Sequence, residues 1–111
     1  MPNFLVTIHH AEDFQSSHVD AAMMQAIDDL NDEMVAANIR RFVGGLQGRD
    51  EARAIVASGD EFQVTPGLYL DTKSYAGGLW VLEVASMDEA IEWGKKAAVA
   101  CRAAVEVRQF H

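Results

Sequence analysis

The sequence contains a single cysteine and little basic charge. Because Cys101 is the only cysteine among 111 residues, no intramolecular disulfide can form, and we expect a reducing compartment. Nine Lys and Arg residues stand against 17 Asp and Glu residues, which gives a net charge of −8. A protein that binds nucleic acid needs a concentrated positive surface to displace counterions from phosphates. The composition therefore argues against nucleic acids and anionic membranes as partners.

Long apolar segments are also absent. No segment approaches the roughly 18 apolar residues that a membrane-spanning helix needs. The N-terminus has neither a basic segment nor a small-residue cleavage site, so we expect no signal peptide and a cytoplasmic location. Hydrophobic residues make up 50% of the chain and charged residues 23%, as in a globular protein. Without a linker or repeat, residues 1–111 are predicted to form a single domain.

Apolar periodicity predicts a long first helix between Val19 and Asn38. Apolar residues recur there at steps of three and four and form one stripe. Ser17 and Asp20 have the spacing of a weak capping box at its start, and Asn38 suits a left-handed end.

The second helix is predicted to follow Ser86, because Ser86 and Glu89 have the spacing of a capping box. Its apolar stripe runs to Cys101, which is therefore expected to be a buried and unreactive thiol.

Strands are predicted before and after each helix. Gly77–Val84 has apolar residues on both faces, so it is expected at the centre of a sheet. Residues 50–65 leave two interpretations open: a hairpin about Gly59, or a short helix followed by a strand. The predicted strands are Phe4–Ile8, Ile39–Val43, Phe62–Thr65, Gly77–Val84 and Ala103–Phe110.

The order strand-helix-strand, a middle hairpin region, and strand-helix-strand predicts an α+β fold. It is a ferredoxin-like split βαβ sandwich with an extra hairpin, in which both helices cover one face of an antiparallel sheet. The opposite face is too apolar to remain in water, so we expect a homodimer in which two sheets pack face to face. The residues expected on that face are Leu5, Thr7, Leu79, Val81 and Phe110.

Several segments occur in the order and spacing of a known family. Residues 71–84 read DTKSYAGGLWVLEV and resemble the E-T-K-E-x-L-G-G-F/Y segment of YCII-related (DGPF-type) proteins. Residues 86–93 read SMDEAIEW and resemble that family's S-x-D-E-A-x-E-W helix start. Residues 104–108 read AVEVR and resemble its closing G-x-V-E-V-R-P strand. The similarity extends over nearly the whole chain.

The resemblance implies a dimeric α+β barrel in which two ferredoxin-like sheets face each other, and a hairpin that turns at residues 58–60. It implies no defined biochemistry. The chain departs from the family at two places. The D-G-P-F signature falls on Pro66–Tyr69, where only the glycine and an aromatic residue match. The family's helical histidine, paired in some members with an aspartate near the end of the second helix, aligns with Ile27, and the aspartate is also missing.

His9 is the candidate acid–base residue. Because neighbouring residues of a strand point to opposite faces, His9 is predicted to face the barrel interior and His10 the helices. An imidazole with a near-neutral pKa can serve as a general acid or base. The residues predicted to bind a ligand in the barrel interior are His9, Tyr69, Asp71, Lys73 and Arg108.

Three functions stay open at this point. The leading one is a homodimer that binds a small polar or anionic molecule in the barrel interior. The second is a cofactor-independent enzyme that uses His9 as acid and base, with Lys73 or Arg108 orienting an anionic substrate. The third is a regulatory module that binds another protein. No metal site or cofactor is predicted, because His9 and His10 point apart and no H-x-H, H-E-x-x-H or C-x-x-C spacing occurs.

Overall fold

The alternation of side chains along β1 (Asn3–Ala11) decides how the sheet is covered. In the computed structural model, which describes residues 1–111, Phe4 and Val6 are fully buried, whereas Leu5 and Thr7 are only half-buried. The buried side chains pack against two helices, and the half-buried ones lie on the opposite face. The period of two therefore separates a helix face from an open face, as predicted.

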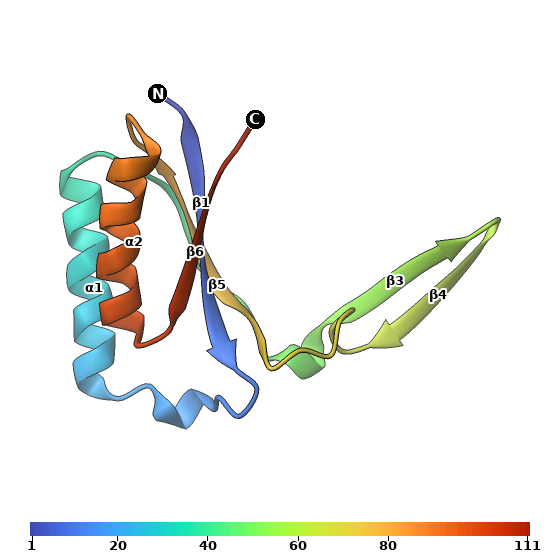
Figure 1. Cartoon of the computed structure of the whole chain (residues 1–111). Helices are drawn as coiled ribbons and strands as arrows, with labels where there is room; N and C mark the ends of the chain where they lie inside the picture. Colours follow the sequence, from blue (N-terminus) through green and yellow to red (C-terminus); the bar gives the residue numbers. More distant parts are fainter.

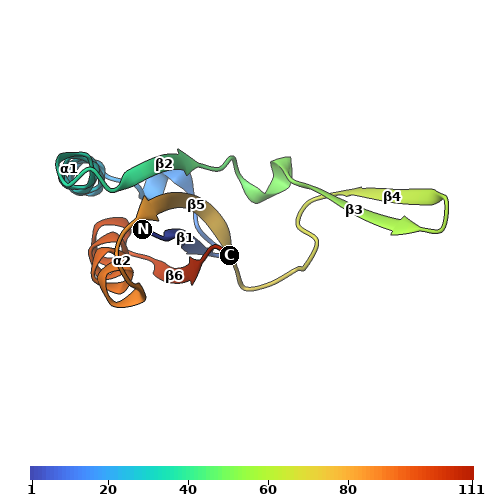
Figure 2. The same ribbon diagram turned by 90° about the horizontal axis from the view of Figure 1, so that it is seen from above.

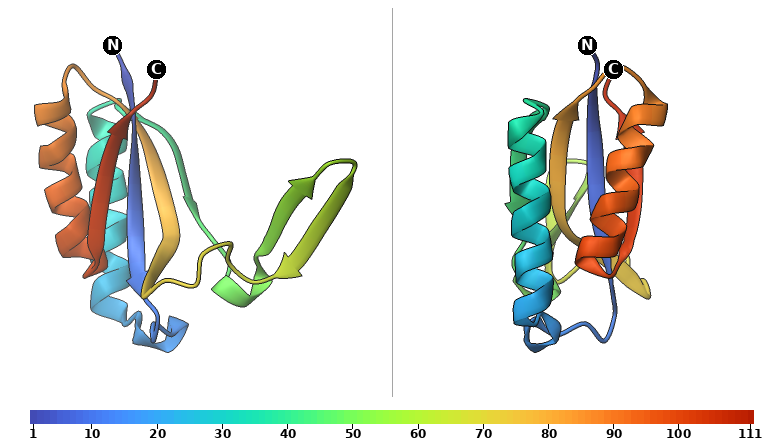
Figure 3. Two further views of the ribbon diagram at one scale, coloured as in Figure 1. Left: turned by 45° about the vertical axis from the view of Figure 1, so that its right-hand side comes forward. Right: turned by 90° about the vertical axis from the view of Figure 1, so that its left-hand side faces the viewer.

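The sheet and the helices have the ferredoxin-like arrangement that the sequence predicts (Figure 1). The sheet is antiparallel, and β5 is one of its two central strands, as expected. Both helices lie side by side on one face of this sheet (Figure 3). In spatial order the strands are β2 (Arg40–Gly45), β5 (Ser74–Glu83), β1 and β6 (Ala104–Gln109), and the helices are α1 (Ala21–Ala36) and α2 (Met87–Cys101).

Polar side chains fix the ends of the helices. The carboxylate of Asp20 accepts a hydrogen bond from the Met23 amide at 2.8 Å, so α1 begins after Asp20 and not at the predicted capping residue Ser17. The chain leaves α1 through Asn38 in the left-handed region (φ 57°), as predicted. Ser86 accepts from the Glu89 amide at 3.2 Å, which confirms the predicted start of α2.

Residues 53–66 form a hairpin, so the first of the two interpretations is correct. β3 (Arg53–Ser58) pairs with β4 (Glu61–Pro66) in a separate two-stranded sheet. The turn uses Gly59 with φ 62°, a conformation that glycine adopts without steric cost. The hairpin projects from the side of the sheet opposite to the helices (Figures 1 and 2).

Neither helix is both long and apolar enough to cross a membrane. The core lies between the helices and the sheet, and its largest fully buried side chains are Phe4, Met34, Leu82, Val6 and Val84.

Candidate ligand-binding site

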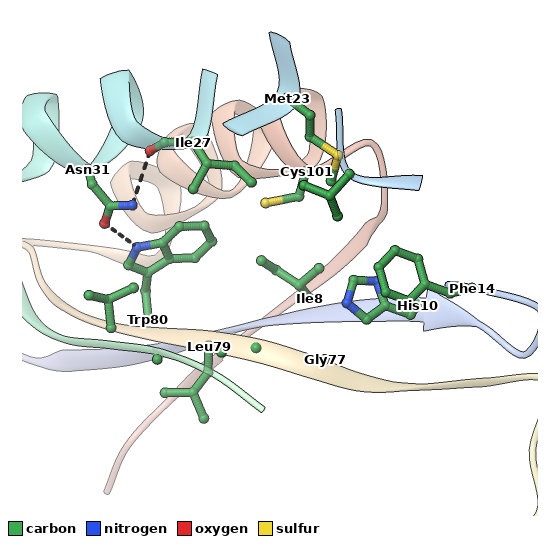
Figure 4. Close-up of a pocket in the computed structure, with 15 residues that line it drawn as sticks. Ile8, His10, Phe14, Met23, Ile27, Asn31, Gly77, Leu79, Trp80 and Cys101 are labelled. Carbon is green, nitrogen blue, oxygen red and sulfur yellow. Dashed lines mark hydrogen bonds between the residues drawn. The ribbon is translucent and has the colours of Figure 1, made fainter. Parts of the chain in front are cut away.

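A cavity of about 210 Å³ lies between α1 and the helix face of the sheet, and we call it the helix-side pocket (Figure 4). Its wall is formed by Ile8 of β1, Met23 and Ile27 of α1, and Trp80 of β5, with Phe14 at one end. Nine of its 15 lining residues are hydrophobic, so a bound molecule would contact mostly apolar side chains.

Glycines make the floor of the helix-side pocket. Gly45 of β2 pairs with Gly78 of β5, two residues from the pair Val43 and Trp80, so both glycines share the helix face. A Cβ on Gly45 would meet no atom within 4 Å, which means that a side chain there would enter open space. Gly45 is itself exposed, so the pocket opens at the β2 edge of the sheet. The pocket exists because these strand positions carry no side chains.

His10 brings the only imidazole into the helix-side pocket. Its ring stacks on Phe14 with 3.7 Å between the ring centroids and meets the edge of Tyr75 at 5.9 Å. Burial, and then repulsion from the neighbouring His9, lowers the pKa of His10 below its usual 6.5. The ring is therefore neutral at pH 7 and offers one N–H donor and one nitrogen acceptor.

Asn31 holds one wall of the pocket in place. Its side-chain oxygen accepts hydrogen bonds from Trp80 Nε1 at 2.9 Å and from Arg40 at 3.1 Å. Its side-chain nitrogen donates to the Ile27 carbonyl at 3.0 Å. With these three bonds made, Asn31 orients the indole of Trp80 and has little capacity left for a ligand.

Cys101 also lines the pocket but is not a nucleophile. The side chain is buried, as predicted, and burial raises the pKa of its thiol to about 11. Because the thiolate is the reactive form, this cysteine is unreactive near neutral pH.

Two of the five predicted ligand-binding residues lie together. His9 is half-buried beside β6, opposite Ala104, and its Nε2 is buried without a hydrogen-bond partner. Lys73 is exposed and lines the same hollow of about 470 Å³, which we call the β1-end hollow. The arrangement places a cation and an unpaired imidazole nitrogen beside the same space.

The other three predicted residues lie elsewhere in the chain. Tyr69 is 73% exposed on the loop between β4 and β5. Asp71 lies on the same loop and forms an ion pair with Arg49 at 3.0 Å. Arg108 is exposed on β6, opposite Leu5. None of these three lines the β1-end hollow, so a single chain does not gather the predicted set.

No group of three or more His, Cys, Asp or Glu side chains has an arrangement that could hold a metal ion.

The family model of the YCII-related domain matches residues 3–111. The chain belongs to the YCII-related family. No curated protein matched the sequence. Ile27, the residue that the sequence resemblance matched to the family's helical histidine, lines the helix-side pocket. In this YCII-related chain the imidazole of the pocket therefore comes from His10 on β1, across the cavity from α1.

Sequence reasoning missed the helix-side pocket, since it assigned the site to the open face. One signal was present: two glycine pairs, Gly44-Gly45 and Gly77-Gly78, fall within strands of this YCII-related domain. Glycine inside a strand often marks a bulge or a close approach of a ligand.

Proposed function

We propose that the protein is a homodimer that binds a small, largely apolar molecule with one hydrogen-bonding group in the helix-side pocket. The observation that carries this proposal is an apolar cavity of about 210 Å³ that contains one neutral imidazole, that of His10. An apolar cavity of about 150 Å³ is large enough to bind benzene. The volume therefore suits a molecule with one ring or a short branched chain.

His10 would recognise the polar group of the ligand. A neutral imidazole accepts a hydrogen bond from a hydroxyl or donates one to a carbonyl. The same ring has the protonation state of a general base at pH 7, so a bound molecule with an acidic proton could lose it to His10. The shape and the apolar lining of the cavity support ligand binding, and proton transfer to His10 would be a further step after binding.

The open face supports the homodimer. Leu5, Leu79 and Val81 are half-buried on this face, where no helix covers them, and Phe42 and Phe110 are 59% and 47% exposed. A continuous apolar sheet face is unfavourable in water, and a second copy packed on it would remove it from solvent.

A second candidate is the β1-end hollow, which suits a small polar or anionic molecule. The buried Nε2 of His9 has no hydrogen-bond partner, and such a group costs free energy until a partner binds. Lys73 supplies a positive charge in the same hollow. The other predicted ligand-binding residues, Arg108, Tyr69 and Asp71, do not line this hollow within one chain. This candidate includes an acid–base enzyme that uses His9.

Titration with phenol and toluene, followed in ¹H–¹⁵N NMR spectra, tests the leading proposal. Phenol should shift the amide signals of residues that line the helix-side pocket. Gly45→Leu should abolish these shifts because its side chain fills the cavity, whereas Gly48→Leu, at an equally open position outside the pocket, should keep them. His10→Ala should weaken phenol binding more than toluene binding, since toluene makes no hydrogen bond.

The same spectra separate the two candidates. If phenol binding survives Gly45→Leu, the helix-side pocket is not the site. Acetate provides the probe for the second candidate: shifts centred on His9 that disappear in Lys73→Ala would support the β1-end hollow.

A further inference from the structure

The hairpin formed by Arg53–Pro66, called the arm here, stands apart from the rest of the chain. Its two strands pair only with each other. It diverges from the open face of the sheet (Figures 1 and 2). The radius of gyration is 15.8 Å, whereas a compact domain of this length has one of about 13 Å. The arm accounts for an extended shape that the main sheet and its helices do not require.

One face of the arm is apolar and exposed. In the β3–β4 register Ile55 pairs with Val64 and Ala57 with Phe62, so these four side chains share a face. Ile55 is 65%, Val64 58% and Phe62 72% exposed. An isolated two-stranded hairpin is marginally stable in water, so this one needs a surface to pack on.

The chain's own open face cannot supply that surface, because the arm points away from it (Figure 1). The open face is itself apolar and uncovered, which leaves two unpaired apolar surfaces on one molecule. A second copy related by a twofold axis would cover both surfaces in both chains, because each chain then contributes the same patches.

Charge also favours a second copy over a partner of opposite charge. The chain carries a net charge of −8, so two copies repel each other unless they meet through uncharged surfaces. The apolar face of the arm has no charge among Ile55, Ala57, Phe62 and Val64, and the centre of the open face has none among Leu5, Thr7, Leu79 and Val81. Beside them the open face carries Arg108 opposite Leu5 and Glu106 opposite Thr7, one charge of each sign, so neither surface has an excess of one sign that would select a basic or an acidic partner.

The surface that a stable dimer needs also favours a contribution from the arm. A stable dimer buries about 800 Å² on each partner, contributed by about 20–30 residues. One face of a short four-stranded sheet supplies only every second residue of each strand. The arm adds two strands of six residues each to that surface.

We propose that the arm packs its apolar face on the second copy, as an extension of the sheet-to-sheet interface. This inference rests on the homodimer proposed above. Each protomer would then be held by the partner's arm as well as by the open face.

An isotope-filtered NOE experiment on a mixed sample tests the contact directly. Dimers are assembled from one ¹³C-labelled and one unlabelled full-length copy. The expected result is intermolecular NOEs from the Phe62 ring and the Val64 methyl groups to the other copy. A dimer without NOEs from the arm would overturn this inference and leave the homodimer standing. A monomer at all concentrations would overturn both.

Analytical ultracentrifugation of variants gives an independent measurement. Phe62→Asp puts a charge into the proposed contact and should raise the dimer dissociation constant by about tenfold or more. Gln63→Asp adds the same charge on the other face of the arm and should leave that constant unchanged. Circular dichroism verifies that both variants fold. An equal effect of the two substitutions, or none from Phe62→Asp, would contradict the proposed packing.

Discussion

The imidazole of His10 occupies the space that a side chain at Gly77 would fill. A Cβ on Gly77 would overlap the ring atoms Cδ2 and Nε2 of His10. Gly77 is the residue skipped where the register between β1 and β5 shifts, because Ile8 pairs with Gly78 and His9 with Ala76. A missing side chain at a bulge therefore fixes the position of the one imidazole in the helix-side pocket.

Gly77→Ala should consequently destabilise the protein by about 1–3 kcal/mol, as overpacking of a filled site does. The same substitution made in a His10→Ala background should cost much less, because the overlapping ring is gone. Urea unfolding of the wild type, both single variants and the double variant gives the coupling energy. Equal costs of Gly77→Ala in the two backgrounds would show that the imidazole does not occupy this space.

The lowered pKa of His10 predicts a pH-dependent stability. Because the folded protein holds this pKa below 6.5, the unfolded chain takes up the proton first as the pH falls. The stabilisation is thus fully present above pH 6.5 and is lost as the pH falls through the folded-state pKa. Unfolding free energies of His10→Gln should fall less than those of the wild type between about pH 7 and pH 5.

His111→Gln, at the exposed C-terminus, is the matched control and should keep the wild-type slope. A wild-type slope in His10→Gln as well would assign the pH dependence to other groups.

The sequence was sufficient to predict most of the fold. Alternation along residues 4–8 and the stripes of the two helices each reflect one buried face, which is a local property of the pattern. The left-handed conformation at Asn38 and the cap at Ser86 also depend on local chemistry. The observed start of α1 differs from the predicted one because Ser17 and Asp20 are both good capping residues, and only the structure shows which one reaches an amide.

The candidate site was less accessible to sequence reasoning. The alternation predicts that His9 and His10 lie on opposite faces, but both line the β1-end hollow, and the pattern carries no information on where a cavity forms. That depends on two glycines, Gly45 and Gly78, which are far apart in the sequence and meet only after β2 has paired with β5. Tyr69 and Asp71 lie in the loop between β4 and β5, and the path of a loop follows from its surroundings and not from its own sequence pattern.

The hydrogen bond between Trp80 and Asn31 gives a third prediction. Trp80 is 2% exposed, so Asn31→Ala leaves its indole N–H buried without an acceptor. The expected loss is about 1–3 kcal/mol of unfolding free energy. Asn31→Asp keeps an acceptor oxygen and should lose less than Asn31→Ala. In a double-mutant cycle, Trp80→Phe should cost less in the Asn31→Ala background than in the wild type, and additive costs would argue against the bond.

At Arg102, the residue that follows α2, we expect a substitution to glycine to be tolerated better than a substitution to alanine. Arg102 ends the helix in the left-handed region, with φ 50° and ψ 44°, and its guanidinium bonds the Asp20 carboxylate at 2.9 Å. Both side chains are more than half exposed, so this ion pair contributes little to stability. The backbone conformation, in contrast, is unfavourable for any residue with a Cβ.

Arg102→Ala loses the ion pair and keeps the backbone strain, whereas Arg102→Gly loses the ion pair and relieves the strain. Arg102→Gly should therefore be about 1 kcal/mol more stable than Arg102→Ala and close to the wild type. Urea unfolding of the three proteins under one set of conditions decides the matter. If the two variants lose equal stability, then the ion pair between Arg102 and Asp20, and not the left-handed backbone conformation, determines the stability of this helix end.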